Sequence, residues 1–387
     1  MKARALLKNF AMPLALLAIF VFFTLWLDRD ALLRRPGASF VFLSPRNLSH
    51  LLVEFSNTAV LALGMFMIIL TGNIDLSVGS GAGMIGGIGA VLVSQQGWSA
   101  PAAMLAGLGV ALVLWFLMGA LIVKQRIPSF IITLGGMQIF KGVFWRVINN
   151  STIDIRSGGR DNLFSDIATY SLPAGRGEFL CVAALAIYAW ILWRARRARV
   201  ALGLAVEPPR NPGLKWGVAA LAGFGLVAVC NNFKGLPAAL LILAATAIVV
   251  YFLTQHTPFG RYLYAIGGNE EAAVLSGINV DRVIIGAFVF MGATAGLTGY
   301  MITSYQGTSS TTVGGLMELD AIAACVIGGT ALKGGRGTVW GVLFGALIMT
   351  SLLNGMTLIP VEEWVNYVAR GTVLVLAVWL DVRLGRD

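Results

Sequence analysis

The sequence predicts an all-α polytopic membrane protein with about twelve transmembrane helices. Of its 387 residues, 57% are hydrophobic and only 12% are charged, whereas a soluble domain carries about 25% charged residues. The apolar residues are gathered in runs that approach the roughly 20 residues needed to cross a bilayer core of ~30 Å. No polar stretch is longer than a loop. We therefore expect a single transmembrane domain over 1–387 and no large soluble domain.

Twelve apolar runs are the candidate spans. They are 10–27, 50–70, 76–94, 101–123, 128–149, 178–193, 216–231, 238–254, 283–304, 319–332, 338–356 and 364–381. Three of them, 178–193, 216–231 and 319–332, are short for a full crossing, and we expect broken or re-entrant segments among them. The first run is expected to be a retained span, because no small-residue cleavage site follows it.

The basic residues indicate how these spans are oriented. With the N-terminus inside, 17 of the 28 Lys and Arg residues fall in inner loops and 8 in outer loops. Cytoplasmic loops carry the excess of basic residues, so we expect both termini in the cytoplasm. This orientation makes 194–215 a basic cytoplasmic loop and 150–177 a periplasmic loop. It also accounts for the net charge of +10 without a nucleic-acid partner.

The polar stretch 257–282 lies between two apolar runs and predicts a short cytoplasmic helix. Asn269 is a good N-cap, and Glu270 and Glu271 suit the positive end of a helix dipole. Gly277 follows about two turns later, where a helix stop belongs. A capped helix of this kind in a membrane loop is expected to be presented to a partner.

Polar residues within or beside the spans are candidates for a substrate pathway, because polar groups at membrane depth are costly and tend to be functional. They are Asn57, Asn73, Asp75, Ser77, Gln138 and Asp320. For Asp75, capping of a helix that begins at Ile74-Asp75-Leu76 is the preferred alternative. Neutral groups such as Asn57 and Gln138 equally suit contacts between helices. Arg370, about two turns inside the last span, is expected to pair with an acid or to reach the interface.

Two sets of glycines spaced by four residues are expected to lie on single helix faces and to let helices pack closely. They are Gly79, Gly83 and Gly87 in one set, and Gly337, Gly341 and Gly345 in the other. Each set follows a polar turn after an apolar run, which suggests an internal repeat of the kind found in transporters. Glycine-rich spans that share only a composition are the alternative.

The sequence contains no enzyme motif. The stretch GGRGT at 334–338 lacks the Lys-Ser/Thr ending of a phosphate-binding loop, and the three cysteines show no metal or disulfide spacing. We expect no metal or cofactor in this chain. No series of buried acids and histidines resembles a proton relay. An ion-coupled carrier and a signalling or structural membrane protein nevertheless remain alternatives to a transporter driven by an external motor.

Five ordered stretches resemble the bacterial ABC-type monosaccharide permeases, the ribose, xylose and galactose uptake family. They are TGNIDLSVGS (71–80), IPSFIITLGGM (127–137), FGRYLYAIGGNEEAAVLSGIN (259–279), ELDAIAACVIGGTALKGGRG (318–337) and LLNGM (352–356). The resemblance runs over nearly the whole chain. It implies a homodimer in the bacterial inner membrane that shares one central pathway for the sugar.

The resemblance also implies two kinds of soluble partner. Cytoplasmic ATPase subunits would bind ATP and Mg²⁺, and a periplasmic binding protein would deliver the sugar. The family segment expected to form the helix that docks on the ATPase, called the coupling helix, matches a continuous run in this sequence. Its residues are Gly268, Asn269, Glu270, Glu271, Ala272, Ala273, Leu275, Ser276 and Gly277, and Glu270–Ala273 is the expected contact.

The layout of the spans points to the substrate. Ribose-type members have one span before the Phe-Gly-Arg segment, and this chain has three, which implies a family core of about ten spans plus an inserted pair around 194–215. This longer layout, LSPRN at 43–47 and the run that starts at Glu318 resemble the xylose permeases. We expect D-xylose or a related aldose as the substrate. A nucleoside or other small solute is the alternative within the superfamily.

Overall fold

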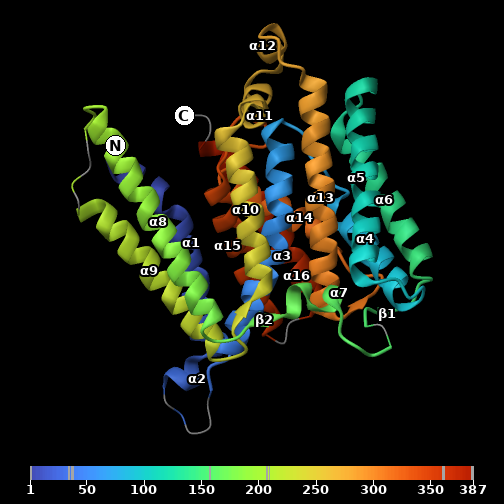
Figure 1. Ribbon diagram of the computed structural model, residues 1–387, viewed down its shortest axis with the longest axis horizontal. Coiled ribbons are helices and arrows are strands. Elements are labelled where there is room, and N and C mark those ends of the chain that lie inside the picture. Colours follow the sequence, from blue (N-terminus) through green and yellow to red (C-terminus); the bar gives the residue numbers. More distant parts are fainter. Residues whose placement is uncertain are drawn as a thin grey trace.

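The computed structural model describes residues 2–33, 35, 39–156, 158–205, 208, 210–359 and 362–384. Its long helices run up and down between two ends of a bundle (Figure 1). The small helix α12 lies at one end, and α2, α7 and the short strands lie at the other. Both marked ends of the chain lie toward the α12 end, as expected if these regions share one side of the membrane.

The elements follow one another with short connections. The helices are α1 (Lys2–Leu27), α2 (Arg29–Leu32), α3 (Pro45–Leu70), α4 (Val78–Ser94), α5 (Ala100–Gln125), α6 (Ser129–Val147), α7 (Leu163–Thr169), α8 (Arg176–Ala201), α9 (Arg210–Asn231), α10 (Ala238–His256), α11 (Pro258–Gly268), α12 (Glu270–Leu275), α13 (Val280–Gln306), α14 (Met317–Ile327), α15 (Val339–Thr357) and α16 (Glu363–Leu384). The strands are β1 (Ile153–Asp154), β2 (Ser171–Leu172), β3 (Leu236–Pro237) and β4 (Thr308–Ser309).

The predicted all-α membrane architecture is confirmed at this coarse level. Each predicted span overlaps one of the long or short helices, and seven helices among the described residues are long and apolar enough to cross a membrane by themselves. They are α3, α5, α8, α9, α10, α13 and α15. With 11 residues, α14 is only about 17 Å long and cannot complete a crossing alone. The number of complete crossings stays a prediction.

The expectation that 178–193 and 216–231 are short was wrong. Helix α8 has 26 residues and α9 has 22. The helix continues through the arginine run because Arg is a good helix former and because two of these side chains stack on aromatic rings one turn earlier. Arg194 lies 5.3 Å from the ring centre of Trp190, and Arg197 lies 4.0 Å from that of Trp193. Much of the predicted loop 194–215 is therefore helical.

The segment 150–177 is also more ordered than a plain loop. Strand β1 pairs antiparallel with β4, and β2 pairs antiparallel with β3, so both ends of the segment are tied to distant parts of the chain. Between the strands, Asn162 caps α7 by accepting hydrogen bonds from Phe164 N and Ser165 N at 2.9 and 3.1 Å. This segment covers the end of the bundle opposite α12 (Figure 1).

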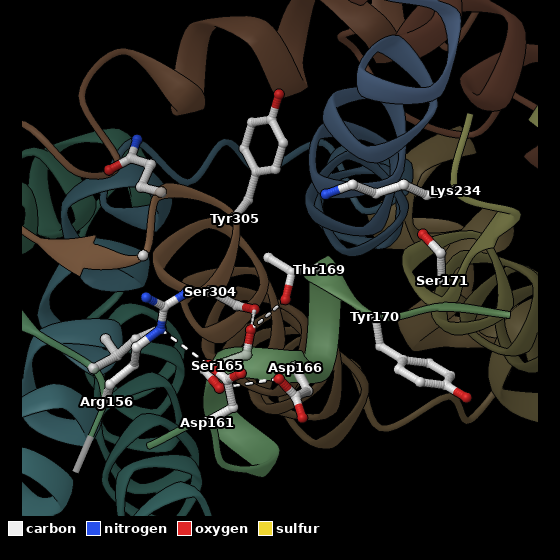
Figure 2. Close-up of a pocket in the computed structure, with 13 residues that line it drawn as sticks. Arg156, Asp161, Ser165, Asp166, Thr169, Tyr170, Ser171, Lys234, Ser304 and Tyr305 are labelled. Carbon is white, nitrogen blue, oxygen red and sulfur yellow. Dashed lines mark hydrogen bonds and ion pairs between the residues drawn. The ribbon is translucent and has the colours of Figure 1, made fainter. Parts of the chain in front are cut away.

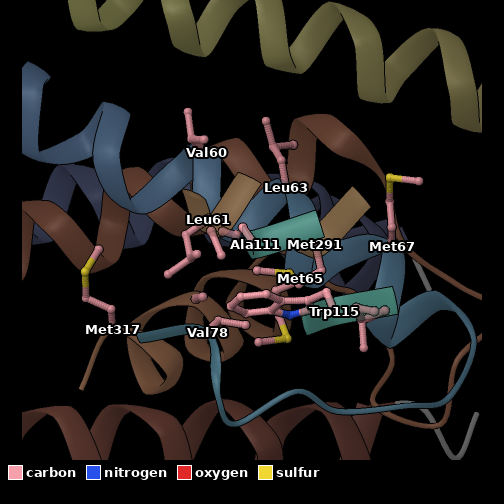
Figure 3. Packing of buried hydrophobic residues seen from close by; sticks show 14 of the residues in the cluster. Val60, Leu61, Leu63, Met65, Met67, Val78, Ala111, Trp115, Met291 and Met317 are labelled. Carbon is pink, nitrogen blue, oxygen red and sulfur yellow. The ribbon is translucent and has the colours of Figure 1, made fainter. Parts of the chain in front are cut away.

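Helix α3 forms the centre of the bundle. Every residue from Ala59 to Leu70 is buried, and α3 contacts α10, α13, α14 and α15. A helix that is apolar on all sides can be stable only inside such a shell of other helices or in lipid. Next to it, the fully buried Trp115 of α5 lies among side chains of α3, α4 and α13 (Figure 3).

Candidate functional site

The capped helix predicted in 257–282 is present as α12. Asn269 Oδ1 accepts a hydrogen bond from Ala272 N at 2.9 Å, and Gly277 follows the helix with a φ of +80°. The Pro-Phe-Gly sequence before it begins another helix, α11. Thr257 Oγ1 accepts a hydrogen bond from Gly260 N there, at 3.4 Å. The segment is thus two short helices set at an angle beyond the end of α10 (Figure 1).

Helix α12 presents a mixed acidic and apolar surface. Leu275 is 89% exposed and Val274 is 55% exposed, and both Glu270 and Glu271 are also exposed. Ala273 is only 4% exposed, so its side chain faces the protein and not the surroundings. Of the predicted contact Glu270–Ala273, only Ala273 faces the protein; the exposed residues of α12 are Glu270, Glu271, Ala272, Val274 and Leu275. Two exposed aliphatic side chains on so small a helix suit burial against a partner.

Helix α11 contacts two turns of the bundle, one after α3 and one after α14, through the backbone of glycine residues. We call this contact the glycine junction; its residues are Gly72, Gly267, Gly334 and Gly335. At Gly267, a Cβ atom would overlap the carbonyl oxygen of Leu70 and the amide of Gly335. Gly335 N donates a hydrogen bond to Leu70 O at 3.0 Å. Gly72, Gly334 and Gly335 have φ values of +79°, +88° and +72°, which favour glycine.

A side-chain hydrogen bond reinforces this contact. The hydroxyl of Tyr264 on α11 donates to the carbonyl oxygen of Gly337 at 3.0 Å. Burial raises the pKa of the Tyr264 hydroxyl above its ordinary value, so the group stays protonated and remains a donor. These contacts join α11 directly to the turns that follow α3 and α14.

Asp75 occupies the first of these turns and is completely buried. Its Oδ1 accepts hydrogen bonds from the amide and hydroxyl of Ser77 at 2.8 and 2.6 Å, and its Oδ2 accepts one from Trp115 Nε1 at 2.7 Å. Helix α4 begins at Val78 with Ser77 as its N-cap residue, so Asp75 lies in the turn before the helix and is not its cap, although the sequence suggested that it was. A carboxylate with this many donors and no exposure has a structural role in this conformation.

Replacing Asp75 by Ala is expected to lower the free energy of unfolding by about 3 kcal/mol, because it leaves buried donors of Ser77 and Trp115 without an acceptor. Thermal unfolding of the detergent-solubilised chain measures the loss. Asp161→Ala is the matched control, since Asp161 is exposed and its ion pair with Arg156 is worth at most about 1 kcal/mol. Equal stability of the two variants would contradict this role of Asp75.

The other predicted pathway residues are dispersed over the bundle. Asn57 is buried in α3 and its Oδ1 has no hydrogen-bond partner among the described residues, whereas Asn73 donates to Thr71 Oγ1 at 2.9 Å. Gln138 is exposed on α6. Asp320 is buried at the start of α14, with Arg370 Nε 3.6 Å from its Oδ1. The expected acid partner of Arg370 is thereby confirmed, and these residues do not form one compact site.

Both glycine sets mark close packing, but only the first lies along one face of a helix. Gly79 and Gly83 lie against the backbone at 313–314, and Gly87 lies against Phe144 of α6. In the second set, Gly341 and Gly345 of α15 meet the backbone of α14, while Gly337 precedes α15 and lies against Phe66 and Thr330. The reason is that α15 starts only at Val339, so a helical spacing does not apply to Gly337.

A hollow of about 760 Å³ opens at the end of the bundle opposite α12. Its lining comes from the residues that follow β1, from α7 and the start of β2, from the turn before β3 and from the end of α13, and it includes Arg156, Asp161, Lys234 and Tyr305. Figure 2 shows the Arg156–Asp161 ion pair at one side and the hydroxyl of Tyr305 pointing away from it. This hollow could not be predicted from the sequence, because its walls come from separated segments of the chain.

Tyr305 connects the hollow to a buried polar network. Its hydroxyl donates to Glu54 Oε1 at 3.2 Å and lies 3.2 Å from His50 Nδ1. Glu54 Oε2 accepts from Asn354 Nδ2 at 3.1 Å, so the network joins α3, α13 and α15. The sequence alone could not pair Glu54 with side chains about 250 and 300 positions away. No group of side chains suited to a metal ion is found within the described residues.

A family comparison identifies the type of protein that carries this arrangement. Residues 47–378 match the family described as "Branched-chain amino acid transport system / permease component". The chain belongs to this permease family. The match covers α3 through most of α16, including α12, the glycine junction and the turn of Asp75. The chain is therefore a transport subunit and not an enzyme.

The relatives of this permease are themselves sugar transport proteins. It is 38% identical over 377 residues to the xylose transport system permease protein XylH of Escherichia coli K12, covering 97% of this chain and 92% of that protein. The XylH protein of Haemophilus influenzae is 37% identical, with 97% and 96% covered. The ribose import permease protein RbsC of the same organism is 31% identical, with 89% and 87% covered. No solved structure matches the permease.

Proposed function

We propose that this permease is the membrane-spanning subunit of an ATP-driven, binding-protein-dependent importer of D-xylose. The observation that carries the proposal is the similarity to xylose permeases over 97% of the chain, compared with 88–89% for the ribose permeases, whose identity is also lower. A permease without a nucleotide-binding motif requires a separate ATPase, which would bind ATP and Mg²⁺. A periplasmic protein would select the sugar and deliver it.

Helix α12 is the part of the permease that we assign to the ATPase. It is capped at Asn269, it extends beyond the bundle, and it exposes both carboxylates and aliphatic side chains. The glycine junction holds its base against the turns after α3 and α14 without flexible side chains in between. Closure of the ATPase would therefore move rigid backbone inside the bundle. Alternating access needs a movement of this kind.

The opposite end of the bundle is assigned to the periplasm. The arginine run of α8 lies toward α12, and under the positive-inside rule this supports a cytoplasmic location for that side. The hollow beside Tyr305 would then face the periplasmic binding protein. In this arrangement the inner membrane holds two copies of the permease around one pathway.

Competition for uptake tests the substrate. Cells that lack their own pentose transporters would produce the permease with the ATPase and binding protein of the same system. Labelled D-xylose is expected to accumulate, and a hundredfold excess of D-ribose is expected to reduce the rate by less than half. Competition by D-ribose or a nucleoside as strong as that by unlabelled D-xylose would contradict the assignment of xylose.

A further inference from the structure

Helix α8 lies at the edge of the bundle, and most of its surface is uncovered (Figure 1). It packs on α9, which in turn packs on α3. Of the 26 residues of α8, only Gly177 and Leu185 are buried. Trp216 of α9 ties the two helices together, because its Nε1 donates a hydrogen bond to Leu185 O at 3.1 Å. The other faces of α8 are open to the surrounding bilayer.

The arginine run of α8, 194–199, begins where the hydrocarbon core of the bilayer ends. The apolar stretch before it, 179–193, has 15 residues and is about 22 Å long as a helix, which is less than a core of ~30 Å. Trp190 and Trp193, at the end of this stretch, are 53% and 50% exposed, and tryptophan is enriched at the membrane–water interface. The first arginines are therefore held at the level of the lipid phosphates and not in the water beyond them.

Two of these arginines line a hollow on one side of α8. Its lining is Trp193, Arg196, Arg197, Val200 and Ala201, and its volume is about 440 Å³. Residues three or four positions apart lie on one face of a helix, so positions 193, 196, 197 and 200 face the hollow together. Arg197 lies 4.0 Å from the ring centre of Trp193. This stacking orients the guanidinium plane and leaves the N–H groups at its edge available to an anion.

No acidic side chain of the described residues balances this charge. The sequence contains no Asp or Glu between Glu178 and Glu207. Glu178 belongs to the opposite end of α8, where it accepts a hydrogen bond from Asn231 Nδ2 at 3.0 Å. Within the part of the chain that the structure describes, neither Arg196 nor Arg197 forms an ion pair. Unbalanced basic side chains at the surface of a bilayer attract anionic lipids.

We propose that this hollow binds the headgroup of an anionic phospholipid. Arg196 and Arg197 each present a planar fork of donors that matches the oxygens of a phosphate. Trp193 offers an apolar surface to the part of the lipid that follows the phosphate. The proposal goes beyond the transport function proposed above and depends only on α8 crossing the bilayer.

The hollow lies apart from the surface that we assign to the ATPase. Helix α12 extends beyond the bundle, whereas α8 lies at the edge of the bundle (Figure 1). An acidic surface of a soluble protein could pair with the arginines, but it would not cover Trp193 on the bilayer side of the hollow. A phospholipid supplies both the negative charge and the apolar cover at this depth.

Binding of short-chain lipids to the full-length permease tests the site. Dihexanoyl phosphatidylglycerol and dihexanoyl phosphatidylcholine have the same chains and differ in the net charge of the headgroup. Calorimetric titration of the permease in an uncharged detergent is expected to show about tenfold tighter binding of the phosphatidylglycerol. In the double variant Arg196→Gln/Arg197→Gln, this preference is expected to fall to about twofold.

The matched control is Arg261→Gln/Arg282→Gln, which removes the same charge from exposed positions on α11 and α13 at the same end of the bundle. The control is expected to keep the preference for phosphatidylglycerol. Arg197→Lys keeps the charge but loses the fork and the stacking on Trp193, and it is expected to bind phosphatidylglycerol about threefold more weakly. This variant keeps the test valid if the double variant does not fold.

Equal affinities of the unchanged permease for the two lipids, or a preference that survives in the double variant, would overturn the proposal. Displacement of phosphatidylglycerol by an equal concentration of inorganic phosphate would overturn the assignment to a lipid, because a free anion would then suffice. Loss of ATPase binding in the double variant with an unchanged lipid preference would show a protein contact instead. None of these measurements involves uptake, so their outcome is independent of the proposed substrate.

Discussion

Replacing Leu275 by Glu is expected to reduce ATP-driven sugar uptake at least tenfold without lowering the thermal stability of the permease. Leu275 is 89% exposed at the end of α12, so a carboxylate there meets only solvent in the isolated chain. In a docked complex the same carboxylate would be buried against the ATPase without a partner. A tenfold loss corresponds to about 1.4 kcal/mol, an ordinary cost for truncating or reversing a central interface residue.

Co-purification of the ATPase with the permease and the rate of sugar uptake are the two measurements. Leu202→Glu is the matched control, because Leu202 is 73% exposed in the turn after α8, at the same end of the bundle. The control is expected to bind the ATPase and to transport at the normal rate. If Leu275→Glu retains both binding and uptake, α12 is not the coupling helix.

Replacing Gly267 by Ala is expected to have an even larger effect, with uptake lost and the free energy of unfolding lowered by about 3 kcal/mol. The new methyl group would overlap the carbonyl of Leu70 and the amide of Gly335. Because these are backbone atoms, no side-chain rotation can make room, and the cost lies at the upper end of that for overpacking. Thermal unfolding in detergent and uptake in cells measure the two consequences.

The adjacent Gly268 supplies the control for this prediction. A Cβ atom at Gly268 meets nothing within 4 Å, so Gly268→Ala is expected to fold normally and to gain a little helix stability. The pair separates a specific steric contact from any general need for glycine in this segment. Similar stability and uptake for Gly267→Ala and Gly268→Ala would mean that the glycine junction does not transmit movement.

Features that depend on neighbours in the sequence were predicted well. The capped helix at Glu270–Leu275 follows from Asn269, two acids and Gly277, all within one short stretch. The apolar runs follow from composition alone, which is why each predicted span overlaps a helix. Pairing of Arg370 with an acid was also one of the two expected outcomes, because an arginine at membrane depth needs a partner or must reach the interface.

Features that depend on distant contacts were not predicted. The burial of Ala273 depends on how α12 packs on the bundle. The sequence of the helix alone could therefore not show that this side chain faces the protein. Asp75 could be identified as a cap or a pathway group, but its bond to Trp115, 40 positions away, could not be predicted from the neighbouring residues. The glycine junction joins α11 to two turns of the bundle, and single glycines in a glycine-rich sequence carry no signal of which others they meet.

The energy source of uptake tests the central claim most directly. The permease would be reconstituted into lipid vesicles with its ATPase and its binding protein, and uptake of labelled D-xylose would be measured with and without ATP on the α12 side. We expect uptake to require both ATP and the binding protein and to be unaffected by ionophores that collapse ion gradients. Uptake that continues without ATP and stops when an ion gradient is collapsed would show an ion-coupled carrier instead.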